Sequence, residues 1–176
     1  MSTQLQDSSR HLERLCEENA ERLDALSAEE GGSITADQMN ALQNDWSEGQ
    51  AVAILDTLLD GVAGSTPSAR ACRSLLVDWD RQMVPESVGA SVWSVFKREL
   101  AREMVRDALG DEVAALYMSV SSSSRSVLDS PARDAWLSDR AAMVDTALDH
   151  ACTWLTEHHG DRSERWTWGS LHPLQL

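Results

Sequence analysis

Helix start and stop signals recur along this chain and limit it to a mainly helical fold. The sharpest signal lies at Thr35, which can serve as an N-cap, with Gln38 three residues later to complete a capping box. Ile34 and Met39 can close the same helix start as a hydrophobic staple. No stretch alternates apolar and polar residues as a half-buried strand does. The sequence therefore predicts a mainly α chain with little or no sheet.

Further helices are predicted from the same kinds of signal. Thr66 followed by Pro67 indicates a helix start, because proline fits the first helical position. Ser87 predicts the start of a long helix that Gly110 ends. The apolar stripe expected on that helix consists of Val88, Val92, Phe96, Leu100, Met104 and Leu109. Near residues 47–49 the apolar face changes phase, which indicates either a kink or two successive helices.

We expect the whole chain, residues 1–176, to form a single helical region. Its parts are a leading helix at 10–30, a helical core at 34–118, a serine-rich surface loop at 119–137, and a last helix with an irregular tail at 138–176. Gly160 is expected to end that last helix.

The acidic charge balance excludes two classes of partner. The formal net charge is −14, so nucleic acid and anionic membrane surfaces would both repel the chain. No apolar run reaches membrane-spanning length, and the opening MSTQLQDSSR contains no signal-peptide stretch. As written, the chain is therefore expected to stay in the cytoplasm.

Cysteine and histidine give no convincing ligand pattern. Cys16, Cys72 and Cys152 are widely separated and lack metal-ligand spacing, so we expect each of these cysteines to be a small residue of the core. His150 and His158 lie two helical turns apart, which permits a metal site, but no third ligand or carboxylate cluster accompanies them. A solvated helix end, where histidine suits the helix dipole, explains them better. No metal and no cofactor is predicted.

Three stretches carry longer motifs. The first is the helix opening at residues 34–45, the second is Leu75-Leu-Val-Asp-Trp-Asp80 followed by Met83, and the third is Arg165-Trp-Thr-Trp-Gly-Ser-Leu-His172. The residues that define these motifs are Thr35, Gln38, Asp45, Trp79, Asp80, Trp166, Trp168, Gly169 and His172.

In this order and spacing, the three stretches resemble the C-terminal part of the large (beta) subunit in the penicillin acylase, or penicillin amidase, family. The second is similar to the family's Leu-x-x-Trp-Asp-Gly-x-Met segment, although Arg81 stands where glycine is usual. The third is similar to its Trp-x-Trp-Gly-x-Leu-His ending. The resemblance implies the N-terminal-nucleophile hydrolases, whose complete members form a four-layer αββα sandwich by self-cleavage of a precursor. This chain would be a helical segment of such a sandwich.

The resemblance also implies a catalytic N-terminal serine, whose α-amino group acts as base, and an asparagine that holds the oxyanion. In the family the serine follows glycine and begins a Ser-Asn-x-Trp-like stretch. The pairs Gly32-Ser33, Gly64-Ser65 and Gly169-Ser170 are not followed by asparagine. Ser2 would become N-terminal if Met1 were removed, but the residues after it do not match. The family's oxyanion asparagine lies upstream of the matched segment, so Asn19, Asn40 and Asn44 inherit no role.

No catalytic residue is therefore predicted, and the nine motif residues are expected to be structural. Trp166 and Trp168 are interpreted as core anchors, with an acyl-pocket lining as the alternative. His172 is expected to pack against these indoles, with a general base as the alternative.

Three functional hypotheses follow. The first is a fragment or split part of a hydrolase of linear amides, such as β-lactam side chains or N-acyl-homoserine lactones, in antibiotic biosynthesis or degradation. It would be inactive without the small subunit and the nucleophile-bearing part of the large subunit. Complete members of the family are often periplasmic or secreted. The second is a free-standing acidic helical interaction module, and the third an enzyme that uses Ser2. The first also predicts exposed apolar patches or self-association.

Overall fold

The computed structural model describes residues 16, 17, 20–25, 27, 28, 33–120, 127–129 and 133–172, with side chains except at 118–120. The chain divides into two compact units, Met1–Asp45 and Trp46–Leu176. Of the leading helix expected at 10–30, the described residues between 16 and 28 are helical, and the others lie outside the described residues.

The first unit contains the helix start predicted at Thr35. Helix α2 is Ala36–Gln43. The backbone N–H of Gln38 donates to Thr35 Oγ1 at 3.2 Å, and the backbone N–H of Thr35 donates to Gln38 Oε1 at 2.9 Å. This exchange gives partners to two N–H groups at the helix start, and the predicted capping box is confirmed.

The second unit is built from helices. They are α3 (Gly49–Leu59), α4 (Pro67–Val77), α5 (Val88–Leu109), α6 (Asp111–Val120), α8 (Arg133–Trp136), α9 (Arg140–His159), the 3-10 turn η1 (Ser163–Arg165) and α10 (Trp168–Leu171). Across the described residues there is no strand, and an isolated antiparallel bridge joins Ser47 to Gln82. The predicted mainly α class is confirmed. The phase change near 47–49 corresponds to two successive helices, α2 and α3.

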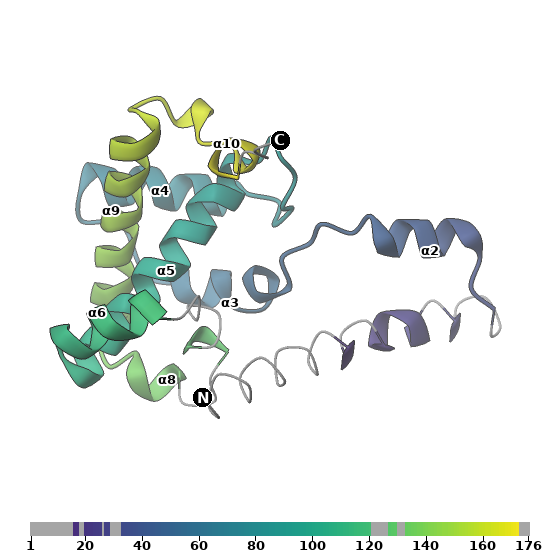
Figure 1. Ribbon diagram of the computed structural model, residues 1–176, viewed down its shortest axis with the longest axis horizontal. Coiled ribbons are helices and arrows are strands. Elements are labelled where there is room, and N and C mark those ends of the chain that lie inside the picture. Colours follow the sequence, from purple (N-terminus) through teal and green to yellow (C-terminus); the bar gives the residue numbers. More distant parts are fainter. Residues whose placement is uncertain are drawn as a thin grey trace. The chain divides into compact units, whose positions relative to one another are not determined.

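Helix α5 lies at the centre of the second unit and packs against α4, α6, α9 and α10 (Figure 1). In the predicted stripe, four residues are fully buried: Val92, Phe96, Leu100 and Met104. Leu109 is instead 53% exposed. It follows Met104 by five residues, and a helix with about 3.6 residues per turn places the two on different faces. The expectation that Leu109 continues the stripe was wrong.

Two aspartates, one turn apart on α9, hold the start of α4. Asp145 accepts hydrogen bonds from the backbone N–H of Ser65, at 2.8 Å, and from its hydroxyl. Asp149 accepts one from the hydroxyl of Thr66. Thr66 Oγ1 also accepts from the N–H of Ala69 at 3.0 Å, as predicted for an N-cap. The turn between α3 and α4 is therefore tied to the middle of α9.

The ends of the long helices follow the glycine signals. Gly110 after α5 and Gly160 after α9 have φ angles of 86° and 87°, in the left-handed region that favours glycine. Arg140, the first residue of α9, donates to the carbonyls of Thr57 and Leu58 at the end of α3. Carbonyls at a helix end lack partners within the helix, so this contact satisfies them. Among the described residues, no helix is both long and apolar enough to span a membrane.

The stretch expected as a serine-rich loop, residues 119–137, contains helical residues in its described part. Residues 119 and 120 continue α6, and Arg133–Trp136 forms α8. Residues 127 and 128 are helical, and Leu128 is fully buried. Residues 121–126 and 130–132, which include most of the serines, lie outside the described residues.

Replacing Thr66 tests the tie between α4 and α9. Thr66→Ala removes both the N-cap acceptor and the donor to Asp149, so we expect the free energy of unfolding to fall by about 1–2 kcal/mol. Thr66→Ser keeps a hydroxyl in place and should stay close to the unchanged protein. Urea unfolding followed by circular dichroism measures both. Equal midpoints for the two variants would show that the hydroxyl contributes nothing.

Candidate functional site

Trp79, from the second predicted motif, is an anchor in the link between α4 and α5. Its side chain is buried, and Nε1 donates to the carbonyl of Gln82 at 3.0 Å. The indole fills the space beside Gly89, where a Cβ would come within 2.3 Å of Trp79 Cγ. The ring centroid of Trp79 lies 6.4 Å from that of Trp93, which in turn lies 6.0 Å from Phe96. These aromatic rings continue from the link into the core around α5.

The first half of this link pairs with residues 46–48. The N–H of Met83 donates to the carbonyl of Trp46 at 2.8 Å, and the N–H of Glu48 donates to the carbonyl of Arg81 at 2.9 Å. Between these bonds lies the bridge of Ser47 with Gln82, whose side chains also meet at 3.1 Å. The residues just before α3 are thereby held against the residues just after α4.

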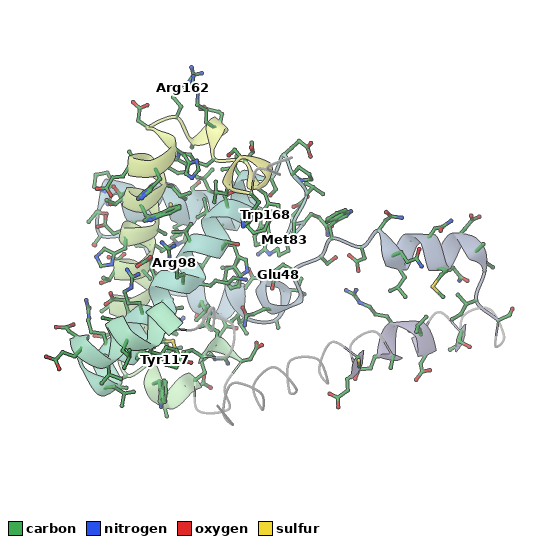
Figure 2. The ribbon with its side chains drawn as sticks, viewed as in Figure 1. Glu48, Met83, Arg98, Tyr117, Arg162 and Trp168 are labelled. Carbon is green, nitrogen blue, oxygen red and sulfur yellow. The ribbon has the colours of Figure 1, made fainter. Side chains whose placement is uncertain are left out.

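The second half of the link pairs with the third predicted motif. The N–H of Trp168 donates to the carbonyl of Ser87 at 2.9 Å, and the N–H of Gly169 donates to the carbonyl of Pro85 at 2.8 Å. A Cβ on Gly169 would lie only 3.3 Å from Pro85, so a small residue suits this position. We call residues 46–48, 79–89 and 166–169 the signature hub; Figure 2 labels Glu48, Met83 and Trp168 within it.

Trp166 and His172, which also belong to the tail motif, make contacts within the second unit. Trp166 is 3% exposed, and its Nε1 donates to the carbonyl of Gly160 at 2.8 Å. The ring of His172 lies 3.9 Å from that of Trp168, and its Nδ1 contacts the Trp168 carbonyl at 3.2 Å. Trp166 is thus a buried anchor for the end of α9, and His172 packs against the Trp168 indole with its ring tilted by 42°.

The other motif residues make local contacts. Asp80 Oδ1 accepts from the N–H of Gln82 at 3.0 Å and so shapes the link. Thr35 and Gln38 belong to the first unit and form the cap of α2. Asp45, in the same unit, pairs with Arg22, with 2.7 Å between Oδ2 and Nη1.

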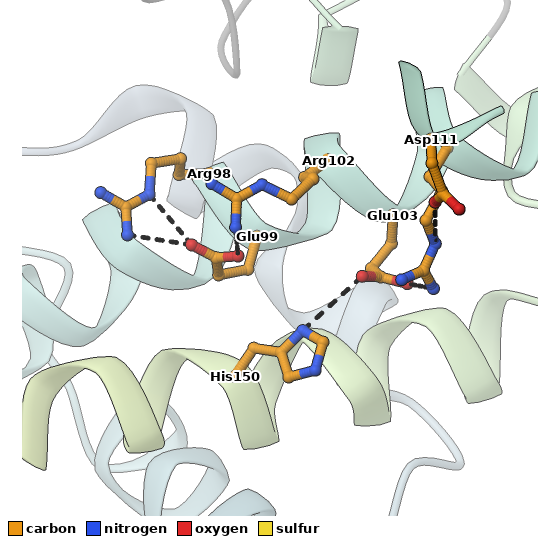
Figure 3. A network of polar contacts seen from close by, with 7 residues as sticks. Arg98, Glu99, Arg102, Glu103, Asp111 and His150 are labelled. Carbon is orange, nitrogen blue, oxygen red and sulfur yellow. Dashed lines mark hydrogen bonds and ion pairs between the residues drawn. The ribbon is translucent and has the colours of Figure 1, made fainter. Parts of the chain in front are cut away.

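Glu99 is a buried carboxylate on α5 that was not anticipated from the sequence. It is 3% exposed, and two arginines of its own helix hold it (Figure 3). Arg98 donates to Oε1 through Nε at 3.0 Å and a second nitrogen at 2.9 Å, while Arg102 donates to Oε2 at 2.7 Å. The sequence signal was the Glu–Arg pair three residues apart, which also occurs on solvated helix faces.

Glu103, one turn later on α5, is buried to the same degree. Arg106 donates to its Oε2, whereas Oε1 has no hydrogen-bond partner and lies 3.6 Å from Nδ1 of His150 on α9 (Figure 3). This carboxylate therefore faces a histidine of the neighbouring helix across a gap slightly too long for a hydrogen bond.

The histidines of α9 do not converge on one point. His158 stacks on Trp154, with ring centroids 4.2 Å apart, and its Nδ1 contacts the Trp154 carbonyl at 2.8 Å. Arg98 lies over the same indole at 4.7 Å, while His150 faces Glu103. Among the described residues, no group of three or more potential ligands could hold a metal ion.

The hydroxyls of the two later Gly-Ser pairs are engaged in structural contacts. Ser65 contacts Asp145 through both its N–H and its hydroxyl. Ser170 Oγ lies 2.9 Å from the carbonyl of Arg165 and 2.7 Å from that of Thr167. Ser2 lies outside the described residues.

Comparison with known families agrees with the motifs. The family model described as penicillin amidase matches residues 13–176. The chain belongs to the penicillin amidase family. No curated protein and no solved structure matches it. The resemblance inferred from the three motifs is confirmed, and two of these motifs are those that meet in the signature hub.

Arg81 is the position at which this penicillin amidase family member departs from the motif, which usually has glycine there. Its φ of 64° lies in the left-handed region, and no other described non-glycine residue has a positive φ. The guanidinium donates to the carbonyl of Trp79 and, at 2.6 Å, to Asp56 on α3. Arginine therefore adopts a backbone conformation suited to glycine while its side chain bonds the link and α3.

Two substitutions at Arg81 separate these effects. Arg81→Ala and Arg81→Gly lose the same side-chain contacts, but only glycine adopts the left-handed conformation without strain. We expect Arg81→Gly to be more stable than Arg81→Ala by about 1 kcal/mol. Denaturant unfolding of the two variants provides the comparison. An alanine variant as stable as the glycine variant would contradict the strain at this position.

A double-mutant cycle tests the contact between Trp79 and Gly89. Gly89→Ala should destabilise the chain by about 1–3 kcal/mol, because the added methyl group overlaps the indole. In a Trp79→Ala background the same change should be neutral or stabilising, because the space is open and alanine favours helix. Urea midpoints of the four proteins give the coupling. If Gly89→Ala costs the same in both backgrounds, the close packing is not what requires glycine.

Proposed function

We propose that this chain is a helical part of a penicillin-amidase-family hydrolase that acts on carbon–nitrogen bonds of linear amides. The observation that carries the proposal is the family match over residues 13–176. Side-chain amides of β-lactams and N-acyl-homoserine lactones are the substrates expected from the family resemblance. The proposal includes an N-terminal-nucleophile mechanism, which is what the resemblance to the penicillin amidase family implies.

The role proposed for the chain within that enzyme is structural support. Residues of two family motifs use their backbone groups and indoles to join three separate segments in the signature hub. Ser65 and Ser170 already bind an aspartate and backbone carbonyls, so their hydroxyls serve the fold. The nucleophilic serine and the oxyanion asparagine are proposed to come from the small subunit and the nucleophile-bearing part of the large subunit.

A co-expression experiment tests the proposal. The chain alone should not hydrolyse a chromogenic N-acyl amide. Co-expressed with the polypeptide of an adjacent reading frame that carries Gly-Ser-Asn-x-Trp, it should co-purify with that polypeptide and support hydrolysis. Serine-to-alanine replacement in that motif should abolish hydrolysis but not co-purification, because the hub does not depend on the nucleophile.

Two outcomes would contradict the proposal. Hydrolysis by the pure chain, lost in Ser2→Ala and kept in Ser65→Ala, would make the chain an enzyme by itself. A stable chain that neither hydrolyses amides nor binds such a polypeptide would instead match the acidic interaction module.

A further inference from the structure

A glutamate and a histidine face each other where α5 packs against α9. Glu103 on α5 is 3% exposed, whereas the side chain of His150 on α9 is 45% exposed. Oε1 of Glu103 lies 3.6 Å from Nδ1 of His150 (Figure 3). A group that gains and loses a proton near neutral pH thus lies beside a buried acceptor of the other helix.

Oε1 of Glu103 is a buried acceptor without a donor. Arg106 donates to Oε2 of the same carboxylate, but Oε1 has no hydrogen-bond partner in the described part of the chain. A buried polar atom without a partner is destabilising, and more so when it carries charge. Hydrogen bonds between charged groups are about 2.7–2.9 Å long, so a movement of about 1 Å would let Nδ1 of His150 supply the missing donor.

The protonation state of His150 decides whether Nδ1 acts as that donor. A neutral imidazole carries one ring proton and can keep it on Nε2, which leaves a lone pair on Nδ1 toward the carboxylate. An imidazolium carries a proton on both nitrogens and adds a positive charge. Because almost half of the His150 side chain is exposed, water can deliver the proton without separation of the two helices.

Arg106 is the charge beside Glu103 that opposes a second cation. Its side chain is 46% exposed, so water and salt screen it, and its Nε lies 4.0 Å from Asp111 at the start of α6. One turn earlier on α5, Arg102 donates to Glu99. The repulsion between Arg106 and a protonated His150 is therefore weakened by solvent and by Asp111.

Charged groups on the other elements packed against α5 and α9 make their contacts elsewhere. Asp145 and Asp149 of α9 itself accept from the start of α4. The remaining charged groups with recorded partners bind residues other than Glu103 and His150; they are Arg70 of α4, Asp56 of α3, and Arg133 and Asp134 of α8. In the described part of the chain, Glu103 is the carboxylate within ion-pair distance of His150.

We propose that protonation of His150 closes an ion pair with Glu103, and that this contact joins α9 to α5 in mildly acidic solution. Unperturbed histidine takes up its proton near pH 6.5, so the contact forms as the pH falls through about 7 to 6 and opens as the pH rises again. The unfolded chain does not hold the two groups together, so the contact stabilises the folded chain only. The inference does not depend on the proposed amidase role.

A double-mutant cycle at two pH values tests the ion pair. The unchanged chain, His150→Gln, Glu103→Gln and the double variant are unfolded in urea at about pH 5.5 and about pH 8, on either side of the histidine range. The coupling between the two positions should be about fivefold in the folding equilibrium constant at the lower pH and close to onefold at the higher pH. The coupling is the quantity to compare, because Glu103→Gln also weakens the contact with Arg106.

A second cycle, which combines His159→Gln with Glu103→Gln, is the matched control. His159 is the last residue of α9, where its positive charge suits the helix dipole, and it forms no ion pair in the described part of the chain. Its coupling to Glu103 should therefore be close to onefold at both pH values. A reducing agent is present throughout, because Cys16 is exposed, contrary to the expectation of a core residue, whereas Cys72 and Cys152 are buried as expected.

Two results would overturn the inference. No coupling at about pH 5.5 would show that the gap between His150 and Glu103 stays open when the histidine is charged. Equal coupling at both pH values would show a contact that does not need the proton. If Glu103→Gln fails to fold, His150→Gln alone decides: it should lower the folding constant about fivefold more at the lower pH, and an equal effect at both would contradict the ion pair.

Discussion

The absence of a side chain at Gly89 allows the second unit to close around the indole of Trp79. An indole is the largest apolar group a protein can bury, and here it occupies the volume that a Cβ at residue 89 would need. Gly89 lies in the first turn of α5, two residues after the N-cap Ser87, whose Oγ accepts from the N–H of Ala90 at 3.1 Å. The packing of Trp79 against Gly89 and the N-cap at Ser87 therefore set the direction in which α5 leaves the link. The packing of α4, α9 and α10 on α5 follows from that direction.

The same region also joins parts of the chain that are far apart in the sequence. Residues 46–48 bond the start of the link through backbone groups, and residues 168–169 bond its end in the same way. Backbone bonds do not depend on side-chain identity, so motif residues in the hub serve mainly to let backbones approach. This explains why the tail motif contains Gly169, which lies against Pro85, beside the large Trp166 and Trp168. Small residues permit the contact, and large ones fill the space around it.

Local features of the fold could be predicted from the sequence, whereas contacts between distant segments could not. The capping box at Thr35, the cap at Thr66, and the ends at Gly110 and Gly160 depend on residues within one turn, so the patterns located them. The motif residues were expected to be structural, but nothing in their spacing predicted that residues 79–87 would pair with two other segments. The prediction that Leu109 is buried with the stripe was wrong because the sequence shows only that an apolar residue follows Met104 by five positions. The helix geometry rotates it away.

The buried carboxylates of α5 show why the ion pairs do not determine how α5 and α9 align. Glu99 and Glu103 receive their hydrogen bonds from arginines of the same helix, so these bonds would persist if α9 slid along α5. The contact of Glu103 with His150 does cross the interface, but at 3.6 Å it is too long for a hydrogen bond. The helices are held in register instead by two other kinds of contact. The hydroxyls of Ser65 and Thr66, at the start of α4, bond the aspartates of α9, and the buried apolar stripe of α5 packs in the core. The arginines make it possible to bury two charges in an acidic chain, because an unpaired buried carboxylate would be strongly destabilising. Alignment of the helices thus depends on shape and on hydroxyl contacts at the start of α4, with charge neutralised locally along α5.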